Sequence, residues 1–440
     1  MKDSETIISL KFNGMRCLDT RTLLDQDLYD LVLLTADIFL DFNKMAMKHF
    51  KLSVFHSYSL SGYSFDACFF DTKASYQYIK DPEIITYLKN NAIRGGPTES
   101  VTRKVIANSE RLNNFNPFKP RSNILIIDEN SQYPSKMKSK VAVGSYSFLS
   151  PDDLSKFDLM TDCNGEWNYI VTVQISHPEN LHVLQSPMPP CPYQRELKYA
   201  DLSTTQQLYS TGLNGEDQAS LFGKKLVADL YDKTYTCCLE AVQYFLESGL
   251  RVANLSKCLK FRQAAILEPF VTSYLNKLSE LRKKAVLEGD EIGSLLFKGI
   301  INRVFGVCLS SAEDYVDFEV CVTSGDMIKL LSKHTFEDFT ILNGLEGTLD
   351  RAKLSLYKMW DLIRSEFGIE NTKLSFYDTD CLCVHIMDPK NQFYKILSRM
   401  EEHLDLSSLP NWHPLYSDRN ASVGGKWKIV TLDAISVISL

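Results

Sequence analysis

Two short acidic segments place carboxylates where the backbone would hold them rigidly. Asp128 directly follows the apolar run 124–127, which is short and branched enough to be a strand buried on both faces. Asp378 and Asp380 flank one threonine within residues 374–386, whose alternation predicts a tight β-hairpin with acids at its tip. Two carboxylates so close together repel each other unless a cation lies between them, so the hairpin favours metal binding.

A third segment offers a cation and an aromatic ring on one helical face. Lys298, Asn302 and Phe305 stand at i, i+4 and i+7 of a pattern whose other positions are aliphatic. A lysine supplies a point charge for a triphosphate, and a flat ring further along the helix can pack against a base. Each of the three segments also has a plain structural alternative: a solvated turn after a strand, an Asp-rich surface turn, and the solvent face of an amphipathic helix.

The elements that must position these residues are indicated by patterning. Residues 31–42 predict a helix packed on a neighbour, and helical patterns run over 224–249 and 269–309. Four prolines and many polar residues predict that 186–223 is an irregular insertion and not part of a sheet. A turn-rich joint precedes the first acidic segment, where glycines permit close backbone approach and an arginine is available for phosphate, at Arg94, Gly95 and Gly96.

The bulk composition bounds the class of protein. At 440 residues with 44% hydrophobic content, the chain is long enough for several domains. Eleven cysteines without zinc-like CxxC pairs indicate reduced thiols in an intracellular protein. No stretch approaches the roughly 20 apolar residues of a membrane-spanning helix, so no membrane partner is expected. The net charge of -7 weakens the case for nucleic-acid binding but leaves room for a local basic channel.

In chain order, the three segments resemble motifs A, B and C of family B DNA polymerases. The patterns are Asp-x-x-Ser-x-Tyr-Pro-Ser from Asp128, Lys-x-x-x-Asn-x-x-Phe-Gly from Lys298, and Tyr-Asp-Thr-Asp ending at Asp380. The chain most resembles the protein-primed polymerases of Polinton (Maverick) elements and adintovirus-like viruses. Supporting stretches are Ile93 to Gly96, Leu267 to Phe270, Leu281 to Ala285, Leu404 to Ser407 and Gly425 to Lys428. The resemblance implies an α+β right-hand fold, with a small antiparallel sheet in the palm and helical fingers.

The resemblance also implies a role for each matching residue. Asp128 and Asp380 would hold two Mg²⁺ ions, with Mn²⁺ as the alternative, and Asp378 would be a third, lesser catalytic acid. Tyr133 would stack under the sugar and exclude the 2′-hydroxyl of ribonucleotides. The triphosphate would be bound at one face by Lys298 and Arg282, with Asn302 and Phe305. Contacts to DNA would come from Arg94, Gly95, Gly96 and Gly306.

Some positions depart from the family pattern. Gln132 stands where leucine is usual, Arg303 where a small residue is usual, and Cys381 where serine is usual. Asp30 resembles the third exonuclease motif, but Gln26 replaces the tyrosine that accompanies it. None of these departures removes an expected metal ligand, whereas proofreading activity is not expected.

The resemblance divides the chain into five parts and implies truncation at both ends. These parts are an exonuclease remnant (1–92), a linker and first palm segment (93–185), the insertion of the protein-primed type (186–223), the fingers (224–310), and the second palm segment with the start of the thumb (311–440). Partners would be template and primer DNA, deoxynucleoside triphosphates and a terminal protein primer, in the nucleus or at a viral replication site. The alternative function is a catalytically inactive, polymerase-derived module that binds nucleic acid.

Overall fold

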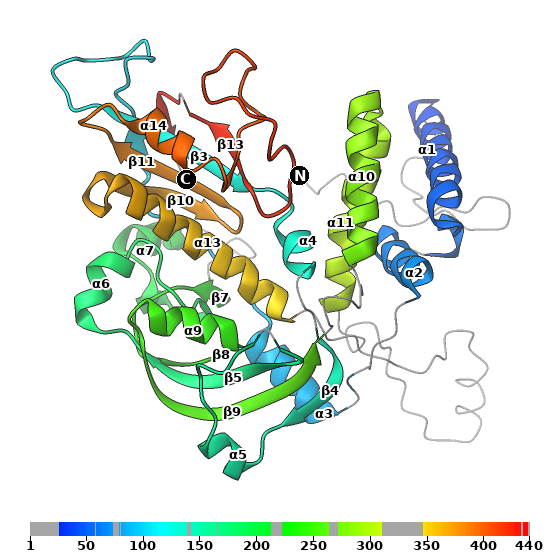
Figure 1. Ribbon diagram of the computed structural model, residues 1–440, viewed down its shortest axis with the longest axis horizontal. Helices are drawn as coiled ribbons and strands as arrows, with labels where there is room; N and C mark the ends of the chain where they lie inside the picture. The colour runs from blue at the N-terminus through cyan, green and yellow to red at the C-terminus, as the bar shows by residue number, and fades with distance from the viewer. Residues whose placement is uncertain are drawn as a thin grey trace.

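The computed structural model describes most of the chain. The described residues are 26–57, 59–73, 79, 81–138, 142–163, 165–212, 222–263, 272–309, 346–432 and 434–438, without the side chains of 26–32, 34, 305–309, 346 and 438. The predicted mixed α+β architecture is confirmed (Figure 1). Within these ranges, none of the helices combines the length and apolar composition that crossing a bilayer requires.

A six-stranded sheet carries both predicted acidic segments. Across the sheet its strands are β1 (Thr98–Ser100), β10 (Thr372–Asp378), β11 (Cys381–Met387), β3 (Ser122–Glu129), β13 (Trp427–Thr431) and β12 (Leu404–Asp405). All neighbours are antiparallel except β12 and β13. The prediction of a strand before Asp128 and of a hairpin around Asp378 and Asp380 is therefore confirmed.

The middle of strand β3, from Ile124 to Ile127, is apolar because both faces of the strand are covered. Leu125 and Ile127 pack into the main core together with helix α13 (Glu346–Phe367). Ile124 points to the other face, into a smaller core beside β2 (Lys104–Ile106) and β14 (Ser436–Ile438). The central strand is thus fixed from both sides, which holds its last residues in place.

A second, four-stranded sheet lies on the other side of α13 from the first (Figure 1). Its order is β4 (Ala142–Phe148), β9 (Arg251–Gln263), β5 (Trp167–Ser176) and β8 (Lys233–Cys238). Helix α9 (Leu239–Glu247) follows β8 and joins the main core, while α3 (Pro82–Tyr87) and η2 (Leu88–Ala92) cover the outer face.

Two expectations about this region are wrong. The helix predicted over 224–249 is limited to α9, because residues 223–227 form β7 and 233–238 form β8. Alternating Tyr235 and Cys237 face the core opposite β5, so tertiary packing imposed a period of two. Residues 186–223 are not wholly irregular either, because β6 (Tyr193–Leu197) pairs antiparallel with β7 (Gly223–Val227). The neighbouring helices are α6 (Glu179–Gln185), η3 (Tyr199–Asp201) and α7 (Thr204–Thr211).

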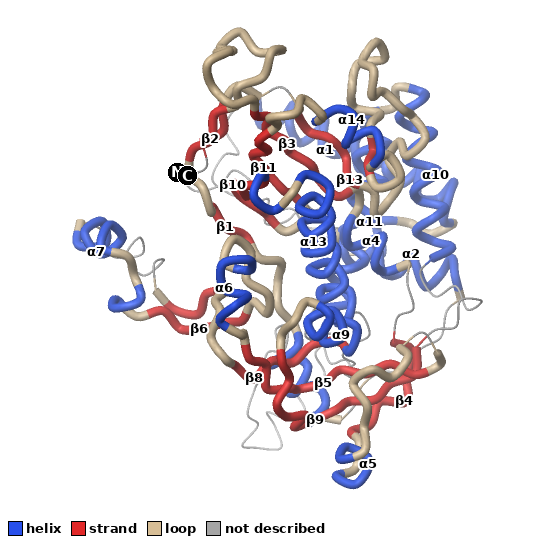
Figure 2. Tube along the Cα trace, turned by 60° about the vertical axis from the view of Figure 1, so that its left-hand side comes forward, coloured by secondary structure: helices blue, strands red, loops and turns tan. Residues whose placement is uncertain are grey.

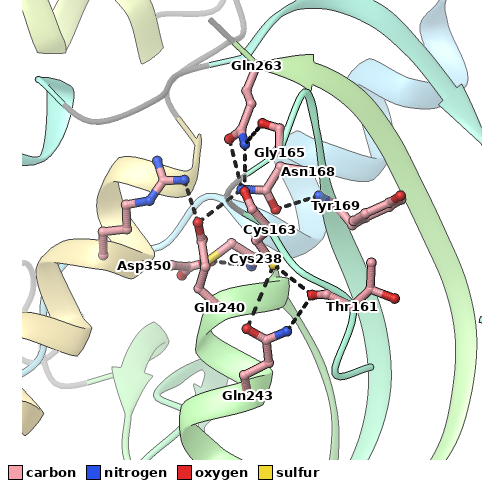
Figure 3. Close-up of polar contacts among 11 residues, drawn as sticks. Thr161, Cys163, Gly165, Asn168, Tyr169, Cys238, Glu240, Gln243, Gln263 and Asp350 are labelled. Atoms are coloured by element: carbon pink, nitrogen blue, oxygen red, sulfur yellow. Dashed lines mark hydrogen bonds and ion pairs between the residues drawn. The ribbon is translucent and has the colours of Figure 1, made fainter. Parts of the chain in front are cut away.

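A buried polar network joins α13 to the second sheet (Figure 3). The Arg351 guanidinium lies 2.8 Å from Glu240 Oε1, to which Asn168 also donates at 3.0 Å. Gln243 donates to the carbonyls of Leu159 and Thr161, at 3.0 and 2.8 Å. These bonds fix the loop between α5 (Pro151–Ser155) and β5 against α9.

Four helices form a separate cluster beside the sheets (Figure 2). They are α1 (Gln26–Phe50), α2 (Leu60–Thr72), α10 (Thr272–Glu288) and α11 (Glu291–Leu309), and the short helix α4 (Gln132–Met137) joins them to the six-stranded sheet. Phe50 packs against Tyr63 and Tyr274 at ring-centroid distances of 6.5 and 5.6 Å. The predicted helices at 31–42 and within 269–309 are confirmed over their described parts. The remaining short helices are η1 (Val54–His56), η5 (Ile369–Asn371) and α14 (Phe393–Arg399).

His177, immediately after β5, makes the fold sensitive to acid. Its side chain is buried, and both ring nitrogens have no hydrogen-bond partner in the described part of the chain. Burial, and then the neighbouring Lys233 cation, lower the pKa of His177 to about 4. Because the unfolded chain takes up this proton near pH 6.5, the stabilising effect of the neutral ring is complete above that pH and is lost as the pH falls toward 4.

We therefore expect His177→Phe to remove part of the acid sensitivity of the fold. Between pH 7.5 and 5.5 the free energy of unfolding of the wild-type chain should fall by about 1.4 kcal/mol more than that of the variant. Urea unfolding of both proteins at the two pH values measures this difference. Parallel losses of stability in wild type and variant would contradict the assignment.

Candidate active site

The backbone register brings two predicted acids together at one end of the six-stranded sheet. Asp128 is the register partner of Cys381, and the N–H of Glu129 donates to the carbonyl of Asp380 at 2.7 Å. Asp128 and Asp380 therefore lie at the ends of neighbouring strands. Because both strands are paired on either side within the sheet, the positions of the two carboxylates are set by rigid elements.

The electrostatics of the two acids reflect their proximity. Burial, and next the Asp128 carboxylate, raise the pKa of Asp380 to about 6. The pKa of Asp128 is raised by burial, although Lys428 and Lys298 act in the opposite direction. Lys428 is the register partner of Asp128 on β13. The site is therefore an acid pair with lysines from a strand and from a helix beside it.

The turn between Asp378 and Asp380 has an unusual backbone. Thr379 adopts a φ of 53°, a conformation that β-branched residues rarely occupy. The N–H of Asp380 donates across it to the carbonyl of Asp378 at 2.5 Å, and the N–H of Thr379 donates to the carbonyl of Pro97 at 3.1 Å. Such a conformation persists only when its surroundings hold it in place.

The joint that precedes β1 supplies part of that support. Thr98 Oγ1 donates to Asp378 Oδ1 at 2.6 Å. A Cβ added at Gly96 would lie 2.6 Å from Thr379 Cγ2, whereas one at Gly95 would meet no described atom within 4 Å. The two glycines predicted to contact DNA thus differ: Gly96 packs against Thr379 in the hairpin turn, and Gly95 is exposed.

The expected phosphate contact of Arg94 requires correction. Its side chain is buried, donates to the carbonyl of Thr236 and lies 4.1 Å above the ring of Tyr235. The guanidinium is therefore directed into the second sheet and fixes the joint there. Spacing alone could not distinguish this buried contact from a surface one, because residue 236 lies far away along the chain.

Helix α4 carries Tyr133 toward the acid pair. The ring is half-buried and packs at the edge of the helical cluster. Burial, and then the carboxylates of Asp380 and Asp378, raise the pKa of Tyr133. The phenol therefore lies within electrostatic range of Asp380 and Asp378.

Apart from Tyr133 on α4, the predicted nucleotide-binding residues lie on α10 and α11. Lys298 and Asn302 are exposed on α11, and Lys298 acts on the pKa of Asp128, so this helix faces the site. Arg282 is half-buried on α10. Phe305 and Gly306 belong to α11 but lie outside the residues whose side chains are described. The same holds for Asp30 on α1, while the stretch from Leu267 to Phe270 lies outside the described residues altogether.

The donor set fits a hard divalent cation. Mg²⁺ commonly takes one or two protein carboxylates and completes its shell with water and substrate phosphates. Asp128 and Asp380 supply such a pair of oxygen ligands, and the repulsion that raises the pKa of Asp380 would be relieved by a cation between them. In the described ranges no group of three or more His, Cys, Asp or Glu side chains is arranged to hold a metal.

A second layer of contacts holds the loop that follows Asp128. Asn130 Nδ2 donates to Asp405 Oδ2 at 2.6 Å, and the N–H of Gly425 donates to the carbonyl of Asn130 at 2.8 Å. Buried Glu129 pairs with Lys136 at 2.5 Å. The supporting stretches at 404–407 and 425–428 therefore pack directly behind the first acid.

Three contributors at the site were not predicted from sequence: Thr98, Lys428 as the cation opposite Asp128, and Gln132. Thr98 and Lys428 act through strand pairing with residues far along the chain. In sequence, Gln132 stands out only as a departure from the family pattern. The sequence shows that lysines and acids are present, but it does not show the strand register that places Lys428 opposite Asp128.

Neither models of known families nor the sequences of curated proteins match the chain. Solved structures of Phi29 DNA polymerase are similar to it. The orthorhombic crystal form gives a TM-score of 0.46 at 12% identity, covering 86% of this chain and 52% of that chain. The complex with primer-template DNA gives 0.48 at 11% identity, covering 96% and 60%. The chain thus spans 52% to 60% of the length of these two polymerase chains.

Proposed function

We propose that the chain is a template-directed DNA polymerase of family B, of the protein-primed type. The observation that carries the proposal is the strand register that unites Asp128 with Asp380. Tyr133 on α4, from the same motif as Asp128, lies within electrostatic range of Asp380, and Lys298 on α11 lies within range of Asp128. An acid pair flanked by a lysine and an aromatic ring suits nucleotidyl transfer better than any of the three plain structural alternatives.

In this proposal Asp128 and Asp380 hold two Mg²⁺ ions. The bound ions would activate the primer hydroxyl and neutralise the charge on the leaving pyrophosphate. Lys298 and Arg282 would bind the triphosphate, where cations offset the charge that develops during phosphoryl transfer. Lys428 would balance the charge of Asp128 from the neighbouring strand. Tyr133 would lie under the sugar and select deoxynucleotides, and Asn302 and Phe305 would complete the face of α11.

The elements then take the roles of a right-handed polymerase. The six-stranded sheet would be the palm, and α10 and α11 would belong to the fingers. Gly95 and Gly306 would lie along the DNA. Partners would be a primed DNA template, deoxynucleoside triphosphates and a terminal protein that offers the first hydroxyl, in the replication of a mobile element or virus.

Incorporation of one labelled deoxynucleotide on a primed template tests the proposal. The wild-type chain should add only the nucleotide that the template specifies, only with Mg²⁺ or Mn²⁺, and Asp128→Asn should abolish the addition because it removes an ionic ligand. Asp152→Asn, on the exposed helix α5, is the matched control and should leave the addition unchanged. Retained DNA binding without any incorporation would instead favour the inactive nucleic-acid-binding module.

A further inference from the structure

Gln132 makes a direct link between the first acidic segment and the turn of the hairpin. The side chain is 2% exposed. Its Nε2 donates to the carbonyl of Thr379 at 3.0 Å and lies 3.4 Å from the carbonyl of Ala352 on α13. One amide therefore connects helix α4, the turn between Asp378 and Asp380, and α13.

The Gln132 amide holds the peptide unit between Thr379 and Asp380. Among the described hydrogen bonds, no other one reaches this peptide unit from outside the hairpin. The N–H of Thr379 is held by Pro97, and the carboxylate of Asp378 is held by Thr98. The peptide unit between Thr379 and Asp380 donates its N–H only within the turn, to Asp378. Its carbonyl accepts from Gln132, so this bond sets the plane of the peptide from which Asp380 projects.

A purely structural role does not account for glutamine at this position. Gln132 Oε1 is buried and has no hydrogen-bond partner in the described parts of the chain. An unsatisfied buried amide oxygen is destabilising, and an apolar side chain of similar size would avoid that cost. The role of glutamine here is therefore the hydrogen bond that its N–H group donates to the turn, and not packing in the core.

We infer that Gln132 is a positioning residue that holds the Thr379–Asp380 peptide in the orientation that lets Asp380 share a metal ion with Asp128. The inference rests on the proposed function, since it assigns a role toward the same acid pair. Thr379 has a φ of 53°, so without the bond from Gln132 the turn is expected to relax toward a conformation that is easier for threonine. Asp380 would then leave its place opposite Asp128.

Gln132→Met tests the inference, because methionine preserves length and volume but cannot donate. Mn²⁺ alone is titrated into the chain and followed by electron paramagnetic resonance, and the Mg²⁺ concentration for half-maximal incorporation is measured separately. Gln132→Met should weaken Mn²⁺ binding and raise the Mg²⁺ requirement by about tenfold to a hundredfold, the range typical of residues that orient metal ligands. The KM for the deoxynucleotide at saturating metal should be unchanged.

Gln243→Met is the matched control. Gln243 also donates to two backbone carbonyls, those of Leu159 and Thr161, and it holds the loop before β5. Figure 3 shows the bond to Thr161. This variant should lose stability without any change in Mn²⁺ affinity. Equal effects of the two substitutions on Mn²⁺ affinity would overturn the inference, because they would reflect general loosening of the fold.

The remaining outcomes separate the inference from the proposed function. Unchanged Mn²⁺ affinity in Gln132→Met overturns the inference, whereas incorporation by the wild-type chain upholds the proposed function independently. A wild-type chain that binds Mn²⁺ but incorporates nothing refutes the proposed function, and the titration still decides the role of Gln132.

If Gln132→Met does not fold, Gln132→Leu replaces it, and failure of both to fold overturns the inference in favour of a structural role. A wild-type chain that binds no Mn²⁺ overturns both.

Discussion

Asp380→Asn is expected to reduce Mg²⁺-dependent incorporation of a deoxynucleotide by at least about a thousandfold. Loss of a single neutral donor to a transition state costs about 10² to 10³ in kcat, and an ionic metal ligand contributes more than a neutral donor. The variant should fold normally, because burial and Asp128 already disfavour the charged form of Asp380 in the absence of metal. Single-turnover incorporation, with the free energy of unfolding measured in parallel, checks both statements.

Asp378→Asn is the matched control for that experiment. The two acids share one turn, but Asp378 is exposed and its Oδ1 accepts from Thr98, a bond that an amide oxygen can keep. We therefore expect a loss of at most about tenfold, which corresponds to about 1.4 kcal/mol, the upper range for weakening one hydrogen bond. Equal losses in the two variants would show that the assignment of Asp380 as the principal ligand is wrong.

Gly96→Ala is expected to reduce incorporation by about a hundredfold, because its methyl group would displace the turn between Asp378 and Asp380. The added carbon would lie 2.6 Å from Thr379 Cγ2 and 2.9 Å from Thr379 Oγ1, too close for either to remain. The turn must then shift, and displacement of a catalytic group by about 1 Å can cost about 10² in rate. Overpacking should also lower the free energy of unfolding by about 1 to 3 kcal/mol.

Two further variants make this prediction specific. Gly95→Ala adds the same methyl one residue earlier, where no described atom lies within 4 Å, and should leave the free energy of unfolding as in the wild-type chain. Gly96→Ala combined with Thr379→Gly should recover activity, because it removes the obstructing side chain and glycine accepts the φ of 53° at this position. Absence of recovery would indicate that Gly96 is needed for another reason, such as direct approach to DNA.

The local pattern of apolar and polar residues was sufficient to predict the strands that hold Asp128 and Asp380. The apolar run before Asp128 is buried on both faces, and the alternation around Asp380 is that of a hairpin, so each acid could be assigned to a strand end in advance. Long aliphatic helices such as α11 were also predictable, because their period is unambiguous. The sequence wrongly predicts a helix over residues 233–238, because this short alternating run lies directly before helix α9.

The contacts that could not be predicted from the sequence depend on pairing between segments far apart along the chain. The sequence predicts that Arg94 contacts phosphate, yet its side chain donates to the carbonyl of Thr236 in the second sheet. Lys428 lies opposite Asp128 only because β13 pairs with β3, and Gln132 reaches Thr379 only because α4 packs beside the hairpin. Spacing predicts which residues share a helix face or a strand, but it does not predict which strands become neighbours.

The pairing of β3 has a consequence for the chain during its synthesis on the ribosome. Both strands that flank β3, β11 and β13, are encoded far downstream of it. A nascent chain therefore carries an apolar, branched segment with two unpaired edges during much of its synthesis, which is the situation in which strands aggregate. Pairing between strands so far apart along the chain also makes the end of the sheet that bears Asp128 and Asp380 a late product of folding.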